Sequence, residues 1–351
     1  MDIDTQHRRQ QMSLRIGIVG AGANTRSRHI PGFQEIDGVE VVAVCNRTRE
    51  SGQKAADEFG IARVYENWLD LVQADDVDAV CIGTWPYLHC EISLATLEAG
   101  KHVLTEARMA MDLAEARQMQ ATAAGSDRVA MIVPAPFYLE SEPTLLEMVA
   151  EGAFGDLLEI HVNALGGGWD PSAPLHWRQR RDLSGQNIMS MGILNETVRR
   201  YAGHDRSLIA QAHTFTPKRH SPEAGTRAVD VPESLGVVSQ LENDATAVYH
   251  LSSVAKHGRG GEIEAHGTKG AFKLEGGSAY VALDGDDDFR VLEISPEKAW
   301  GWDVEADFVN AIRDRKPVTH TNFDDGVKYM MFTEAVQVSL SEGRKVELAS
   351  L

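Results

Sequence analysis

Two glycines near the N-terminus stand between an apolar run and a helical pattern, where they could hold a dinucleotide. Gly20 permits a tight turn and Gly22 lets a pyrophosphate approach the backbone, while the first N–H groups of the following helix supply partial positive charge. A third glycine of this pattern would fall at Thr25 and is missing. Because a strand pattern precedes the glycines and another follows the helix, we favour a nucleotide-binding turn over an ordinary strand-to-helix connection. The expected cofactor contacts in this turn are Gly20, Gly22, Ala23, Asn24 and Thr25.

The end of the second strand decides which dinucleotide fits. An acidic residue there would bind the ribose 2′-hydroxyl and repel a 2′-phosphate, but the chain has Asn46, Arg47 and Thr48. Arg47 could bind a phosphate with both arms of its guanidinium, and Thr48 could donate its hydroxyl. The sequence therefore predicts NADP, bound in part by these three residues. If Arg47 and Arg49 only begin a solvated helix, NAD stays the alternative.

Composition restricts the class of protein. The chain has 351 residues, 43% of them hydrophobic and 25% charged, which is ordinary globular usage and long enough for two domains. Its 34 basic against 52 acidic residues give a net charge of −18, which would repel nucleic acid and anionic membranes. We find no run that could cross a bilayer and no signal-peptide core in the first 13 residues, so a cytoplasmic location is expected. The three cysteines form no Cys-x-x-Cys pair, and we expect neither a disulfide framework nor a metal site.

Strand and helix patterns alternate over the first third of the chain, as a parallel sheet requires. The expected strands are 15–19, 39–45, 64–65, 77–82, 102–104 and 129–133, and the expected helices are 51–59, 68–73, 89–99 and 112–122. Residues 134–136, Pro-Ala-Pro, then interrupt the pattern. We predict an α/β protein with a tail at 1–13, a doubly wound dinucleotide-binding domain at 14–133 and a substrate and oligomerisation domain at 134–351.

The second half changes character, because its strands alternate polar and apolar residues. Expected strands are 157–164, 246–252, 261–266, 271–274, 291–294 and 345–348, and expected helices are 304–314 and 324–341. This pattern predicts a largely antiparallel sheet. A large open sheet face would be too apolar to leave in water, so we expect a homo-oligomer, either a dimer or a tetramer.

Several motifs together resemble the Gfo/Idh/MocA oxidoreductases over nearly the whole chain. The matching segments are Gly20-x-Gly22 with His29, residues 84–89, 97–106, Trp177-Arg178, 267–270 and 308–313. The resemblance implies a Rossmann domain joined to an α/β domain with an open-faced sheet, an NAD(P) cofactor, and redox chemistry on sugars, polyols or their derivatives. It also implies that the loop 84–89 lies along the cofactor and that Glu106 lies near the nicotinamide ribose. The cofactor contacts it suggests are Thr84, Trp85, His89, Glu106, Trp177 and Arg178.

The catalytic residues of that family are not matched. Family members usually follow the glutamate with Lys-Pro, where this chain has Ala107 and Arg108. A second family signature aligns with residues 190–197, and Leu194 stands where a histidine would exchange a proton with the substrate hydroxyl. We therefore expect a non-standard acid/base set.

Hydride transfer is the cofactor's chemistry, but the proton of the substrate hydroxyl needs an acceptor. His176, in a Pro- and Gly-rich loop, is the first candidate because its pKa suits proton exchange. Arg108 could stabilise an alkoxide but cannot act as a base. Tyr138, Asn195 and Glu196 follow as further candidates.

Three functions are compatible with these residues. The first is an NAD(P)-dependent oxidoreductase acting on a sugar, a polyol or a related small molecule. The second is a redox-neutral enzyme that retains its cofactor and oxidises then re-reduces its substrate around an elimination or epimerisation. The third is a non-catalytic dinucleotide-binding protein. A turnover assay with free cofactor separates them.

Overall fold

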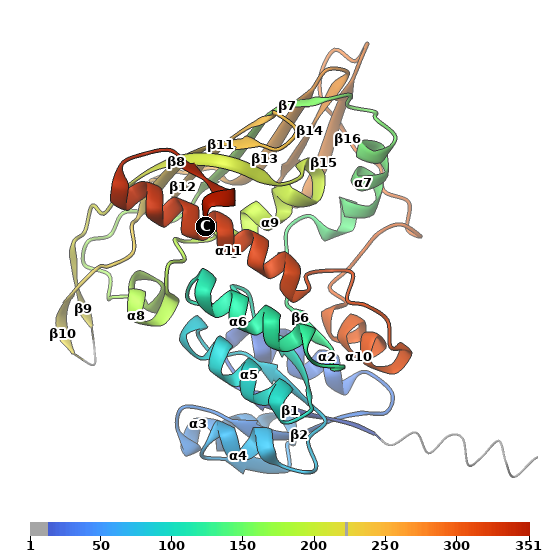
Figure 1. Cartoon of the computed structure of the whole chain (residues 1–351), viewed down its shortest axis with the longest axis vertical. Coiled ribbons are helices and arrows are strands. Elements are labelled where there is room, and N and C mark those ends of the chain that lie inside the picture. The colour runs from blue at the N-terminus through green and yellow to red at the C-terminus, as the bar shows by residue number, and fades with distance from the viewer. Residues whose placement is uncertain (1–12, 222–223) are drawn as a thin grey trace, which may run out of the picture. The chain divides into compact units, whose positions relative to one another are not determined.

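The computed structural model describes residues 13–221 and 224–351, which form two compact units (Figure 1). The first unit contains the chain up to residue 110 together with 114–134 and 303–327, and the second contains 111–113, 135–302 and 328–351. The expected tail at 1–13 lies, up to residue 12, outside the described residues.

The first unit is built on a six-stranded sheet in the order β3-β2-β1-β4-β5-β6, and every neighbouring pair is parallel. The strands are β1 (Leu14–Val19), β2 (Val39–Cys45), β3 (Arg63–Tyr65), β4 (Ala79–Ile82), β5 (His102–Thr105) and β6 (Ala130–Ile132). Strand order reverses between β1 and β4. In doubly wound sheets a ligand binds outside the carboxyl ends of the strands at this switch point. The predicted fold class is confirmed.

Helices connect these strands as crossovers. They are η1 (Thr25–His29), α2 (Ile30–Gln34), α3 (Arg49–Phe59), α4 (Trp68–Gln73), α5 (His89–Glu98) and α6 (Leu113–Ala124), with the short η2 (Pro86–Leu88) before α5. The helix after the glycine turn starts at residue 23 and continues through a π-helical stretch into α2.

One helix of the first unit comes from far along the chain. Helix α10 (Val304–Asp314) buries its apolar side in this unit, and the Phe308 ring meets the edge of Phe33 with their centroids 6.3 Å apart. The compact units therefore differ from the predicted single division at residue 134. An amphipathic pattern predicts a helix but does not say which core its apolar side will join.

The second unit holds a nine-stranded sheet in the order β16-β15-β14-β13-β7-β12-β11-β8-β17. Its strands are β7 (Leu157–Leu165), β8 (Asp205–His213), β11 (Ser234–Leu241), β12 (Thr246–Ser252), β13 (Gly260–Gly267), β14 (Gly270–Glu275), β15 (Ser278–Leu283), β16 (Arg290–Val291) and β17 (Val346–Glu347). All its neighbouring pairs are antiparallel except β7 and β12. A separate hairpin joins β9 (Lys218–Ser221) and β10 (Gly225–Ala228).

Helices cover one face of this sheet (Figure 1). They are α7 (Glu142–Ala150), α9 (Met191–Ala202) and α11 (Phe323–Glu342), with the shorter η3 (Leu139–Ser141), η4 (Trp177–Gln179), α8 (Arg181–Ser184) and η5 (Leu348–Ser350) nearby in the sequence. On the opposite face Ile209, Val238 and Val248 are paired across β8, β11 and β12 and are each more than a third exposed. We call these three side chains the open-face row.

The sequence patterns missed the hairpin strands β9 and β10 and extended the strand at 291–294 too far, since β16 ends at Val291. Within the nine-stranded sheet they missed β8, β11 and β15. The missed strands pair on both sides within the sheet, and those partners are distant in sequence. Short polar and apolar patterns do not reveal such partners. Among the described residues, we find no helix whose length and apolar character would let it span a membrane.

Candidate functional site

The glycine turn follows β1 and lies beside the end of β4. Gly20 has φ +89°, and a Cβ there would come within 2.7 Å of the Thr84 backbone nitrogen. Only glycine suits both the backbone conformation and this close approach. The turn is fixed further by Asn46, whose side-chain oxygen accepts a hydrogen bond of 2.7 Å from the backbone N–H of Ala21.

Thr25, at the position of the missing third glycine, is fully buried against Gly83. A Cβ on Gly83 would lie 2.0 Å from the Thr25 hydroxyl oxygen and 2.4 Å from the Gly20 carbonyl oxygen. The small residue that allows close packing between helix and strand therefore stands on β4's side of the contact and not on the helix. The backbone path of the turn is retained without a third glycine.

A pocket of 430 Å³ opens at this edge of the sheet. It is lined by Val19, Gly20, Ala21, Gly22, Cys45, Asn46, Arg47, Ser51, Glu66, Asn67, Trp68, Gly83, Thr84, Trp85, Tyr87 and Leu88. The hydroxyl of Thr84 is buried and has no hydrogen-bond partner among the described residues. A pocket that joins the glycine turn to an unpaired hydroxyl and aromatic side chains fits a dinucleotide.

The two residues after β2 that were expected to bind a phosphate, Arg47 and Thr48, have different positions in the structure. The Arg47 guanidinium lies 5.9 Å from the centroid of the Trp85 ring, and both side chains line the pocket. Thr48 does not line it: its side chain caps α3 by accepting a 3.2 Å hydrogen bond from the Ser51 N–H. Of the expected phosphate-binding pair, the structure places only Arg47 at the pocket.

Glu66 also lines the pocket, and sequence reasoning did not single it out. It follows β3, whose end lies beside the end of β2, so an acidic group reaches the site from the neighbouring strand. An ion pair joins it to Arg49. The end of β2 has no acidic residue, but the loop after the neighbouring β3 brings one to the pocket, which the sequence of β2 alone does not reveal.

Glu106 follows β5 and belongs to a cluster of buried ionisable groups. Its Oε1 accepts hydrogen bonds from the Asn24 amide and from Nε2 of His29, the latter at 3.1 Å. Nδ1 of His29 donates to the Glu305 carboxylate of α10. Burial opposes the charge of His29, but the two carboxylates outweigh it and raise the pKa of His29 to about 9. Burial likewise opposes ionisation of Glu106, and His29 outweighs it, so the pKa of Glu106 is lowered.

His89 is buried and holds two loops together. Its Nδ1 lies 2.9 Å from the Arg108 carbonyl oxygen and its Nε2 lies 3.0 Å from the Thr84 carbonyl oxygen. Burial lowers the pKa of His89 despite these contacts. His89 therefore joins the loop after β4 to the loop after β5 and does not line the pocket.

Arg108 is buried, 5% exposed, and its peptide bond with the half-buried Ala107 is cis. Arg108 is therefore not a solvated surface cation. Its guanidinium does not line the pocket around the glycine turn.

In the second unit, His176 is exposed and is the N-cap residue of η4. Its Nδ1 accepts a 3.2 Å hydrogen bond from the Arg178 N–H, and its ring centroid lies 5.6 Å from that of Trp177. The Arg178 guanidinium lies over the Trp177 ring, 4.3 Å from its centroid. Partial burial and Arg178 lower the pKa of His176. With Nδ1 accepting, the neutral ring carries its proton on Nε2, so Nε2 is a donor in this conformation.

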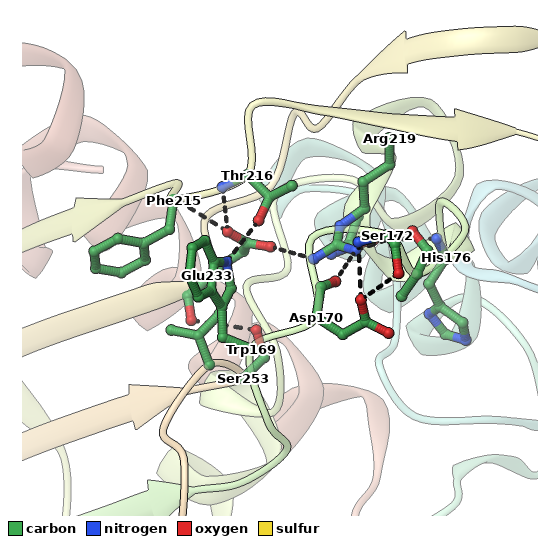
Figure 2. Close-up of polar contacts among 12 residues, drawn as sticks. Trp169, Asp170, Ser172, His176, Phe215, Thr216, Arg219, Glu233 and Ser253 are labelled. Atoms are coloured by element: carbon green, nitrogen blue, oxygen red, sulfur yellow. Dashed lines mark hydrogen bonds and ion pairs between the residues drawn. The ribbon is translucent and has the colours of Figure 1, made fainter.

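The loop that carries His176 is held by a buried ion pair. Arg219 donates to the carbonyl oxygens of Asp170 and Ala173 at 2.7 and 3.0 Å and to Glu233 at 3.0 Å (Figure 2). The other Glu233 oxygen accepts from the N–H groups of Phe215 and Thr216. A pocket of 310 Å³ adjoins this pair, and its lining includes His176, Arg178, Gln179, Arg219 and Glu233. We call these five residues the loop pocket.

The remaining acid/base candidates make hydrogen bonds within the second unit. The Tyr138 hydroxyl donates to the Gly261 carbonyl oxygen at 3.3 Å, and burial with two nearby glutamates raises the pKa of Tyr138 to about 12. Leu194 is buried in the core of the second unit. The Asn195 amide donates to Asp205 at 2.7 Å, and Glu196 accepts from Arg200 at 2.6 Å. Within the described residues, no three His, Cys, Asp or Glu side chains are arranged to hold a metal ion.

Two family models match this chain, one over its N-terminal part and one over its C-terminal part. Residues 14–133 match the model of an oxidoreductase family with an NAD-binding Rossmann fold, and residues 144–273 match the GFO/IDH/MocA C-terminal domain. Levoglucosan dehydrogenase of Pseudarthrobacter phenanthrenivorans is 24% identical over 97% of this chain and 99% of its own. The 1,5-anhydro-D-fructose reductase of Ensifer adhaerens is 29% identical over 73% of this chain and 74% of its own.

A solved structure of levoglucosan dehydrogenase in complex with NADH and L-sorbose superposes with a TM-score of 0.85. The alignment covers 95% of this chain and 98% of that chain at 23% sequence identity. This likeness establishes a shared fold.

Proposed function

Because the chain belongs to the Gfo/Idh/MocA family of NAD-binding oxidoreductases, we propose that it transfers a hydride between NAD(P) and a sugar or a closely related polyol. The observation that carries this proposal is the 430 Å³ pocket, which combines the glycine turn, the Thr84 hydroxyl and the Trp85 ring at the switch point of the sheet. The names of the two sugar-acting relatives support a carbohydrate substrate. The cofactor, once bound, supplies the hydride acceptor or donor.

NADP is the cofactor that we propose. Arg47 lines the pocket and can pair with a 2′-phosphate, whereas Asn46 is engaged with the glycine turn. Glu66 opposes this preference, but Arg49 pairs with it and offsets its charge. NAD is the alternative if Arg47 serves only to stack on Trp85. The neighbouring proposed contacts are Gly20, Gly22, Ala23, Asn24, Thr25, Thr84, Trp85 and Glu106, with His89 and Thr48 acting indirectly.

We further propose that proton exchange uses a group other than the family's lysine and histidine. His176 is the first candidate, and Trp177 and Arg178 beside it would contact ligand. To accept a proton, the His176 ring must release the hydrogen bond from the Arg178 N–H, because that bond occupies the Nδ1 lone pair. Arg108 would stabilise negative charge and cannot accept a proton. Tyr138 is a weaker candidate, since its raised pKa keeps the hydroxyl protonated.

The open-face row supports association of the chain with itself. Three apolar side chains in register on adjacent strands form a flat surface that a second copy could cover. We propose a dimer or tetramer that uses this face.

A turnover experiment tests the proposed function. The purified protein is incubated with NADP or NAD and a panel of sugars and anhydrosugars, while the absorbance of reduced nicotinamide and the sugar products are followed. A net change in reduced cofactor with a carbonyl product supports the proposal. Product without net change supports the redox-neutral alternative. Tight cofactor binding with neither signal across the panel supports a non-catalytic dinucleotide-binding protein.

A further inference from the structure

Three ionisable side chains form a hydrogen-bonded series between α10 and the end of β5. Glu305 on α10, His29 on η1 and Glu106 after β5 are linked in that order by hydrogen bonds. The His29 and Glu305 side chains are almost fully buried and Glu106 is 16% exposed. Glu305 and His29 are separated by 276 positions in the sequence.

The geometry determines the protonation state of His29. Carboxylates only accept hydrogen bonds when ionised, so a ring that contacts one through each nitrogen must carry a proton on both. The raised pKa of His29, to about 9, agrees with this assignment.

The backbone of α2 makes room for this arrangement. A Cβ on Gly32 would lie 2.8 Å from a Glu305 carboxylate oxygen, so a side chain at that position would displace the carboxylate from His29. The Glu106 carboxylate is held at one oxygen only, because Asn24 and His29 both bind Oε1. Among the described residues, none donates a hydrogen bond to Oε2 in the structure.

We propose that Glu305 is a positioning residue for cofactor binding: it keeps His29 doubly protonated, and His29 in turn fixes Glu106 beside Asn24 on the helix after the glycine turn. Glu106 lies outside the lining of the 430 Å³ pocket, and its Oε2 would accept a hydrogen bond from a ligand that extends beyond this lining. This inference rests on the proposed function, since it takes the ligand to be the ribose hydroxyls of NAD(P). Without Glu305, His29 keeps one carboxylate partner and releases a proton at lower pH. The neutral ring can then place its single proton on Nδ1 and no longer hold Glu106.

Other ionisable groups near these three side chains do not replace Glu305. His89 on α5 and Cys81 on β4 are buried; burial lowers the pKa of His89 and raises that of Cys81, and neither side chain supplies a carboxylate to His29. Asp307 on α10 is nearby, and burial and neighbouring carboxylates raise its pKa. Asp303, the N-cap residue of α10, contributes to that rise.

The experiment uses the full chain with Glu305→Gln, Glu305→Asp and the control Asp78→Asn. Asp78 pairs with Arg15 at 2.8 Å in the same unit. The pair lies at the amino ends of β1 and β4, and neither residue lines the pocket at the carboxyl ends of these strands. Dissociation constants for NADP(H) and NAD(H) are measured from neutral to alkaline pH by tryptophan quenching. NMR of ¹⁵N-labelled histidine follows His29 in the absence of cofactor.

We expect Glu305→Gln to weaken cofactor binding by about tenfold, with a loss that grows toward alkaline pH, as removal of a charge-assisted hydrogen bond predicts. Glu305→Asp should restore part of the affinity, and Asp78→Asn should leave it unchanged. A wild-type His29 that loses its ring proton near its ordinary pKa overturns the proposal, even if the variants fail to fold. Equal binding and equal pH profiles in wild type and Glu305→Gln also overturn it. If the wild type binds no dinucleotide, the proposed function fails, while the NMR titration still decides the state of His29.

Discussion

The Thr25 hydroxyl packs against the α-carbon of Gly83 so closely that no side chain fits between them. This contact joins the helix after the glycine turn to the end of β4, and Gly83 also borders the backbone of Gly20. Thr25 and Gly83 therefore form one unit of packing at the point where the dinucleotide pocket begins.

Gly83→Ala should destabilise the protein by about 1–3 kcal/mol, the usual cost of overpacking a rigid contact. Urea denaturation followed by circular dichroism gives the free energy of unfolding. The double variant Thr25→Gly/Gly83→Ala should recover only the part of the loss that comes from the Thr25 side chain, because the Gly20 carbonyl oxygen, 2.4 Å from a Cβ at position 83, stays in place. Additive losses in the double variant would show that the two residues do not share this space.

Arg47→Ala should weaken NADP(H) binding by about 1.5–3 kcal/mol, the scale of a charge-assisted hydrogen bond, and leave NAD(H) binding nearly unchanged. Arg63→Ala is the matched control, since Arg63 pairs with Asp76 in the same unit and neither residue lines the pocket. Titration calorimetry measures both cofactors. Equal weakening for the two cofactors would contradict recognition of the 2′-phosphate.

His176→Ala and His176→Asn separate two roles of one side chain. Asparagine can still accept the hydrogen bond from the Arg178 N–H, but it cannot exchange a proton. If His176 is the acid/base group, both variants should lower kcat by about 10²–10⁴-fold with cofactor affinity preserved. Activity that survives in His176→Asn and falls only in His176→Ala would assign His176 to capping η4.

Glu233→Ala should cost about 3–5 kcal/mol of stability, because it leaves the buried Arg219 guanidinium without its carboxylate. The same change should expose the loop around Asp170 to proteases, since Arg219 holds that loop through two carbonyl oxygens. Asp182→Ala, which breaks a more exposed pair with Arg180, should cost less than about 1 kcal/mol. Similar losses in the two variants would contradict the structural role assigned to the loop pocket.

The stability of the wild type should fall between pH 6.5 and about 9 as His29 loses its proton. The pKa of His29 is higher in the folded chain than in the unfolded one, so its stabilisation is complete below pH 6.5 and is lost as the pH rises through about 9. The contribution at stake is about 3 kcal/mol. His29→Gln should flatten this alkaline slope in chemical denaturation.

His102→Gln is the control for the His29 variant. Burial and Arg128 lower the pKa of His102 to about 4, so its linkage acts on the acidic side. An unchanged alkaline slope in His29→Gln, or a flattened one in His102→Gln, would contradict the assignment to His29.

The local sequence determined the parts of this protein that depend on short-range physics. The order of strands and helices through Ile132 follows from apolar runs of strand length, helix periodicity and the glycine at position 20, whose φ of +89° excludes other residues. The position of Arg47 at the end of β2 was also readable, because the carboxyl end of each parallel strand faces the same edge of a sheet.

Only the tertiary structure decided which distant residues share a site. Glu305 meets His29 because α10 packs in the first unit, and Glu66 reaches the pocket because β3 lies beside β2. The Arg178 N–H occupies the Nδ1 lone pair of His176, a detail of loop conformation that no spacing of residue types encodes. Hydrogen bonds and ion pairs of this kind form between groups brought within about 3 Å by the packing of whole elements. Which groups form these hydrogen bonds and ion pairs is therefore decided by the folded cores and not by any single segment.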